Sequence, residues 1–102
     1  MTEQCWVRTT VNVEANPPLN PYPPFITVRV TRWDGYTADS ALKNRIERLR
    51  WTRTNFDLDR ANRRISLTRR REGIDPIARS RPTIEHVTIE FLDTDPSQDN
   101  KE

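Results

Sequence analysis

Arginines clustered in the middle of the chain are the residues whose type and spacing could do chemistry on a partner. Residues 29–81 carry fifteen Lys and Arg against seven Asp and Glu, a net charge of +8, although the whole chain of 102 residues carries only +2. A guanidinium forks onto phosphate or carboxylate and stacks on flat rings. The segment therefore predicts a surface that attracts an anionic partner.

The candidate nucleic-acid-binding residues combine several cations with one indole. Phosphates repeat along a strand, so a binding surface needs several cations on one face, with an aromatic plane where bases are exposed. The alternative is a solvated charged face, in which pairs such as Lys43 with Glu47 neutralise part of the charge. The set is Lys43, Arg48, Arg50, Trp51, Arg53, Arg63, Arg64, Arg69, Arg70 and Arg71.

Catalytic and metal-binding patterns are poorly supported by the sequence. The single histidine, His86, falls on the outward side of a predicted strand, with Glu85 and Glu90 as its nearest acidic neighbours in sequence. A nucleophile needs a base within hydrogen-bond reach, and no such pairing is indicated. Only Gly35 and Gly73 are present, so no glycine-rich phosphate loop exists. We expect no enzyme activity, no metal site and no cofactor.

Alternating apolar and polar residues predict the strands that would position these arginines. The pattern covers residues 7–13, 25–33 and 83–92. In the second of these, Ile26, Val28 and Val30 share one face; in the last, residues 87, 89 and 91 face the core and His86 faces out.

An amphipathic helix is predicted between the second and third strands. Leu42, Ile46 and Leu49 recur at i, i+4 and i+7, and Ala38 could add a preceding turn. The possible N-caps are Thr37, Asp39 and Ser40. Two alternatives remain open for Trp51: the helix continues through it and exposes the indole, or the helix stops near residue 50 and the ring turns into the core.

Residues 56–72 predict a hairpin. Phe56 and Leu58 alternate around Asp57, and Ile65 and Leu67 alternate around Ser66. A second helix over residues 59–72, ended by Gly73, is the alternative. We favour the hairpin because residues 65 and 67 would diverge on a helix.

The element order is strand, strand, helix, then three strands, which defines an α+β class: a mostly antiparallel sheet of about five strands with one helix on one face. We expect a single domain over residues 1–92 and an acidic disordered tail over residues 93–102. The connections at 16–24 and 73–82 are bounded by prolines. The opposite sheet face would be open to solvent or to a partner.

Composition bounds the class of protein. Hydrophobic residues make up only 33% of the chain, so a homodimer or a bound partner that completes the core is plausible. Cys5 is the only cysteine, and no apolar run reaches membrane-spanning length. We expect a cytoplasmic protein with no membrane partner.

Three functional hypotheses follow from these features. The first is a small non-enzymatic protein that binds nucleic acid, with RNA or single strands favoured over duplex sequence readout. The second is a compact inhibitor or adaptor of the viral or phage type that binds an acidic or nucleic-acid-binding groove of a larger protein. The third is a homo-oligomeric assembly subunit.

Overall fold

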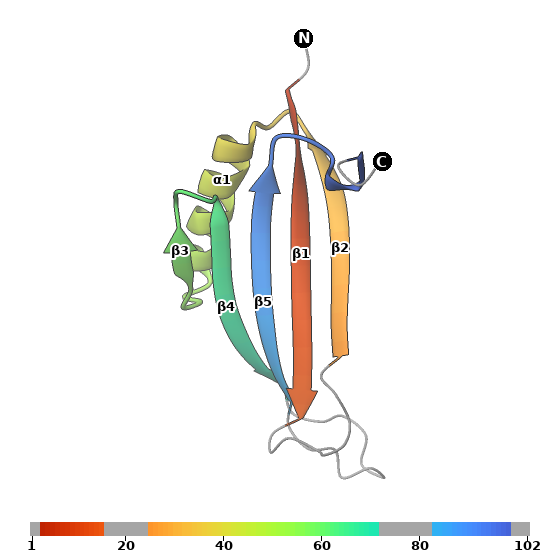
Figure 1. Ribbon diagram of the computed structural model, residues 1–102. Coiled ribbons are helices and arrows are strands. Elements are labelled where there is room, and N and C mark those ends of the chain that lie inside the picture. The colour runs from red at the N-terminus through yellow and green to blue at the C-terminus, as the bar shows by residue number, and fades with distance from the viewer. Residues whose placement is uncertain (1–2, 16–24, 72–82, 99–102) are drawn as a thin grey trace.

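The computed structural model describes residues 3–15, 25–71 and 83–98 and contains one sheet and one α-helix (Figure 1). The sheet has five strands in the order β2-β1-β5-β4-β3, and every neighbouring pair is antiparallel. This confirms the predicted α+β class. The elements are β1 (Gln4–Ala15), β2 (Phe25–Asp34), α1 (Ala38–Trp51), β3 (Asp57–Asp59), β4 (Arg64–Arg71), β5 (Thr83–Leu92) and the 3-10 turn η1 (Pro96–Gln98).

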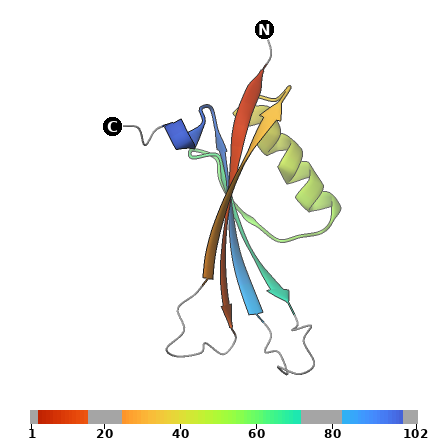
Figure 2. The same ribbon diagram turned by 90° about the vertical axis from the view of Figure 1, so that its right-hand side faces the viewer.

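Strand alternation gives the sheet two different faces. Val7 lies opposite Phe91, and Trp6 lies opposite Leu92 on the other face. Helix α1 covers only the face that carries Val7 (Figure 2). We call this the helix face and the other the open face.

The core lies between α1 and the upper part of the helix face. From α1 it takes Leu42 and Ile46, with two small alanines that let the helix approach closely. From the sheet it takes Ile65 and Phe91, which are 0% and 1% exposed. The buried set is Cys5, Val7, Ala38, Ala41, Leu42, Ile46, Ile65, Val87, Ile89 and Phe91.

Both ends of α1 have specific caps. Thr37 is the N-cap: its hydroxyl accepts from the Ser40 backbone N–H at 3.1 Å, and the Ser40 hydroxyl accepts from the Thr37 N–H at 2.9 Å. This reciprocal pair satisfies two backbone donors at the start of the helix. At the other end α1 includes Trp51, so the alternative in which Trp51 turns into the core is wrong. The indole is 88% exposed.

The hairpin prediction for residues 56–72 is confirmed. Leu58 pairs with Ile65 across β3 and β4. The Asp59 carboxylate accepts from the Asn62 backbone N–H and side-chain amide, which closes the turn. The turn wins over a helix because the 65/67 alternation buries Ile65 completely against the core, whereas a helix would turn residue 67 away from residue 65.

The C-terminal segment is structured through Gln98. The sequence places a disordered tail from residue 93 onward, whereas the structure forms the η1 turn at Pro96–Gln98, and Asp93 pairs with Arg63. The Asp95 carboxylate accepts from the backbone N–H and hydroxyl of Ser97. Local side-chain hydrogen bonds of this kind give no hydrophobic period, so the sequence pattern missed them. Residues 99–102 and both proline-bounded connections, 16–24 and 73–82, lie outside the described residues.

The open face exposes three aliphatic residues of β2. Ile26, Val28 and Val30 are 58%, 59% and 40% exposed. The alternation that predicts this strand is correct, but α1 packs on the other face, and no second layer covers this one among the described residues. Within the same residues, no helix is long and apolar enough to cross a membrane.

Truncation of Ile65 should be far more costly than truncation of Glu47, which is exposed on α1. We expect Ile65→Ala to lower the free energy of unfolding by about 2–5 kcal/mol, through lost burial and a residual cavity. Glu47→Ala should change it by less than about 0.5 kcal/mol. Urea denaturation measures both. Equal losses for the two variants would contradict the position of the core.

Candidate nucleic-acid interface

The end of α1 presents an exposed indole among arginines. Arg48, Arg50 and Arg53 are exposed around Trp51, at positions 48 and 50 on the last turn and position 53 just after it. Across the described ranges, none of these three guanidiniums has a carboxylate within ion-pair distance. We call these four residues the basic helix end. Cations here also interact favourably with the C-terminal end of the helix dipole.

Arg53 occupies a backbone conformation that usually belongs to glycine. Its φ is +59°, in the left-handed region that costs an L-residue roughly 1–2 kcal/mol. The Arg53 N–H donates to the Arg50 carbonyl at 3.1 Å, and the Thr54 N–H donates to the Leu49 carbonyl at 2.9 Å. Arg53 therefore occupies the position just after the helix C-cap, where helices most often carry glycine.

Lys43 and Arg50 come together on the outer side of α1. They line an open hollow of about 470 Å³ with Arg60, which arrives from the β3–β4 turn. Asp39 and Glu47 line the same hollow, so its charge is mixed. No ion pair between Lys43 and Glu47 is formed in the described part of the chain, although their spacing would allow one.

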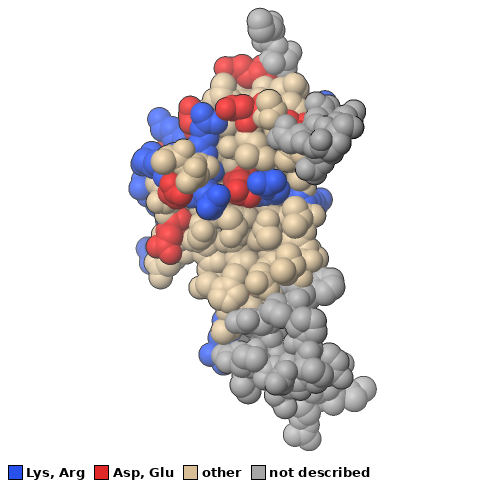
Figure 3. Space-filling view, in the orientation of Figure 1, with Lys and Arg blue, Asp and Glu red and all other residues tan. Residues whose placement is uncertain are grey.

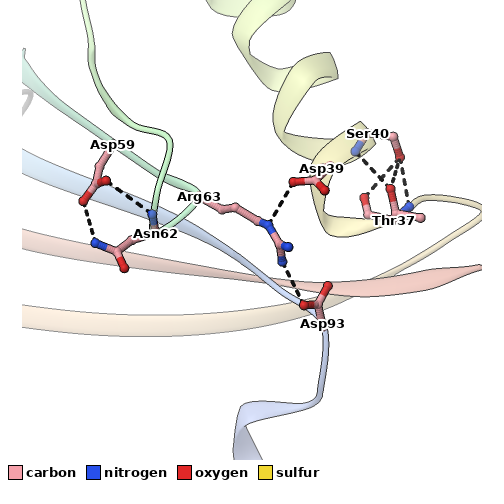
Figure 4. A network of polar contacts seen from close by, with 7 residues as sticks. All are labelled: Thr37, Asp39, Ser40, Asp59, Asn62, Arg63 and Asp93. Carbon is pink, nitrogen blue, oxygen red and sulfur yellow. Dashed lines mark hydrogen bonds and ion pairs between the residues drawn. The ribbon is translucent and has the colours of Figure 1, made fainter.

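Arg63 is engaged in holding the fold together. Its guanidinium contacts Asp39 at 2.9 Å and Asp93 at 2.9 Å, so it joins the β3–β4 turn to the first turn of α1 and to the end of β5 (Figure 4). Its carbonyl accepts from the Phe91 N–H at 3.0 Å. The hydrogen bond to Asp93 raises the pKa of the Arg63 guanidinium.

Arg64 is engaged on the open face. The Glu90 carboxylate accepts from the Arg8 guanidinium at 2.9 Å and from the Arg64 guanidinium at 3.3 Å. One carboxylate of β5 therefore links the two flanking strands. Charged side chains gather on the upper half of this face, while the described lower half is largely uncharged (Figure 3). The arginines therefore do not converge on the open face.

Strand alternation separates the three consecutive arginines of β4. Arg69 lies on the helix face and pairs with Glu85 at 3.0 Å. Arg70 lies on the open face, opposite Ile84, and is exposed. The side chain of Arg71 lies outside the described residues. These neighbours in sequence are thus not neighbours on one surface.

Arg45 lies close to Arg48 and Arg69 at two hollows beside α1, although the sequence patterns did not single it out. Its guanidinium lies 5.6 Å from the centre of the Trp33 ring, which in turn packs edge-on against Tyr36 at 5.3 Å. Partial burial, and secondarily the charge of Arg48, lower the pKa of Arg45. Its position three residues after Leu42 and four before Leu49, beside the apolar stripe, is the sequence signal that could have found it.

Towards its C-terminal end, α1 diverges from the sheet (Figure 2). A groove lies there between the helix and the sheet. Arg45 and Arg69 line this groove of about 220 Å³, and its walls are otherwise mostly apolar, including Leu49 and Ile89. Arg45 and Arg48 also line a neighbouring hollow with Thr52. Two arginines of α1 and one of β4 therefore line the two neighbouring hollows near the helix end.

Metal-ligating side chains are scattered over the described residues. No three His, Cys, Asp or Glu side chains gather closely enough there to hold a metal ion. His86 is exposed on the open face, away from the basic helix end.

Comparison with known proteins finds no matching family model, no similar curated protein and no similar solved structure. The functional assignment therefore depends on the residues of this chain.

Because of Glu90, the free energy of unfolding should decrease as the pH becomes acidic. Hydrogen bonding and charge pairing with Arg8, reinforced by Arg64, lower the pKa of Glu90 below its ordinary value. A depressed carboxyl pKa contributes stability that is present above the unfolded-state value of about 4.3 and is lost as pH falls through the folded-state value. We expect Glu90→Gln to destabilise the protein near neutral pH and to flatten the loss of stability on acidification.

The measurement is urea denaturation across pH 3–7, with Glu47→Gln as the control. Glu47 is exposed on α1 and no arginine pairs with it in the described ranges. An acid limb that is unchanged in Glu90→Gln would contradict the role of this carboxylate.

Proposed function

We propose that the protein is a non-enzymatic nucleic-acid-binding protein that uses the basic helix end and the neighbouring helix-side arginines. The observation that carries this proposal is Trp51: a large indole, 88% exposed, at the end of a helix. Three exposed arginines lie within three residues of it in sequence, and none has a carboxylate partner in the described residues. The indole gains little burial within the fold, and a ligand that covered it would supply that burial.

The chemistry favours RNA loops or single strands over duplex sequence readout. Unstacked bases offer flat faces to an indole, and base–aromatic stacking is worth about 1–3 kcal/mol per base. Cations around the ring would meet the phosphates on either side of the stacked base. In a duplex the bases are already stacked on each other, so Trp51 would find no free base face.

The helix-side position of the cations supports the same proposal. Arg45, Arg48 and Arg69 approach from α1 and β4 around the groove beneath the helix end. The Arg45 guanidinium lies over the face of the Trp33 ring, and a cation–π contact of this kind is worth about 0.5–2 kcal/mol. A guanidinium held in this way loses less side-chain freedom when it meets a phosphate.

Removal of two cations from the basic helix end should reduce both affinity and its dependence on salt. For single strands the slope of log K against log salt is about −0.7 per phosphate contact. We expect Arg48→Gln with Arg50→Gln to make the slope shallower by about 1.4, measured by fluorescence anisotropy with a labelled RNA oligomer at several salt concentrations.

The control is Arg32→Gln with Arg70→Gln, which removes the same charge from exposed positions on the open face. This control should keep the wild-type slope. Equal losses in the two double variants would show that only net charge matters, and absence of salt-sensitive binding by the wild-type protein would overturn the proposal.

Arg53→Gly should separate stability from binding. Glycine adopts a φ of +59° without strain but has a larger unfolded-state entropy, so the free energy of unfolding should stay the same or rise by up to about 1 kcal/mol. Affinity for the RNA oligomer should fall, because one phosphate contact is lost. Urea denaturation and anisotropy measure the two effects. Unchanged affinity would remove Arg53 from the interface.

A further inference from the structure

The outer edge of β2 is a second unusual surface, and it differs chemically from the basic helix end. Strand β2 is ten residues long, lies at one end of the sheet and pairs only with β1 within the described structure. Its outer backbone groups therefore present a template for another strand. Natural edge strands are usually short or protected by charged side chains. Strand β2 is long for an edge strand, and it exposes three aliphatic side chains.

On the open face, the most exposed large aliphatic side chains of the described residues all belong to that edge strand. Ile26, Val28 and Val30 are exposed there, whereas the adjoining strand β1 presents Thr10 and Asn12 at the same level of the sheet. A partner that packed flat on the open face would meet a mixed surface beyond β2, which includes Asn12, Thr68 and His86. A strand added at the edge would instead place its side chains directly beside the three aliphatic ones.

The other uncovered edge is guarded. Strand β3 pairs only with residues 64–66 of β4, so residues 67–71 have no outer neighbour in the described structure. That stretch contains three consecutive arginines. Charged side chains of this density guard an edge against pairing, even though Arg69 pairs with Glu85 at 3.0 Å. Strand β2 carries two arginines in ten residues, and one of them, Arg32, pairs with Asp34 at 3.1 Å.

We propose that two copies of this chain pair through their β2 edges, antiparallel about a two-fold axis at Val28, to form a continuous ten-stranded sheet. In this register residues 25–31 pair with residues 31–25. Val28 lies opposite Val28 of the second copy, and Ile26 lies opposite Val30, so six aliphatic side chains meet across the seam. Such cross-strand pairs are the unit of sheet stabilisation.

Neighbouring registers are less favourable. A two-fold axis perpendicular to the sheet keeps each side chain on its own face. The axis must therefore pass between two copies of the same residue. An axis at Arg29 places the two Arg29 side chains against each other, and like charges directly opposite are destabilising. An axis at Val30 places Val28 opposite Arg32 and Ile26 opposite Asp34. An axis at Thr27 shortens the paired stretch to residues 25–29.

The proposed dimer also determines how the two basic helix ends are arranged. A two-fold axis perpendicular to the sheet leaves both copies of α1 on the same face, so both basic helix ends point to the same side of the assembly. Two linked sites on one strand bind with increased avidity. The pairing itself does not depend on nucleic-acid binding and is tested without it.

Crosslinking of engineered cysteines tests the register. The native Cys5 is 0% exposed and does not compete for the reagent. With a short bis-maleimide, Val28→Cys should give a covalent dimer. Ile26→Cys and Val30→Cys should crosslink better as a mixture than either does by itself. Thr68→Cys, exposed on the open face of β4, should stay monomeric.

Sedimentation equilibrium provides the second measurement. Wild-type protein should show a concentration-dependent dimer, and Val28→Lys should raise the dimer dissociation constant at least about tenfold, because two ammonium groups meet at the axis. Thr68→Lys is the matched control and should behave as wild type. A monomer at every concentration, a dimer that Val28→Lys leaves unchanged, or crosslinking at residue 68 as strong as at residue 28 would overturn the proposal.

Discussion

Packing of α1 against one face of the sheet is the constraint on which the other features depend. The buried set that surrounds Ile65 and Phe91 is small, and it is completed by residues of a single helix. Because one helix covers only part of one face, residues 3–15, 25–71 and 83–98 leave one sheet face and the outer β2 edge uncovered, and the end of the helix diverges from the sheet. The basic helix end and the β2 edge both arise from this incomplete second layer.

Electrostatics divide the arginines into two groups with different roles. Arg63 and Arg64 satisfy carboxylates that would otherwise remain poorly paired, and they join the hairpin, the helix and β5. Arg48, Arg50 and Arg53 have no such partner in the described residues. The net charge of residues 29–81 therefore overstates the charge available to a ligand, because part of it is neutralised within the fold.

Much of the fold, and less of the site, could be predicted from the sequence. The period-2 pattern of β5 and the 42/46/49 spacing of α1 follow burial against the core, so these elements were predictable. The period-2 pattern of β2 predicts the strand but not which of its faces is covered, because its aliphatic residues are exposed. The pairing of Arg63 with Asp39 and Asp93 joins residues 24 and 30 positions apart, and no local period records such contacts. Arg45 was missed for the same reason, since its contact with Trp33 depends on tertiary packing.

The most direct test of nucleic-acid binding by the basic helix end is a two-dimensional NMR titration of the three tryptophan indole N–H signals with a single-stranded RNA oligomer. Trp51 is exposed at the helix end, Trp6 lies on the open face, and Trp33 lies beneath Arg45. We predict that the Trp51 signal shifts most and that the Trp6 signal stays in place. A shift confined to Trp6, or no shift at low salt, would contradict binding at the helix end.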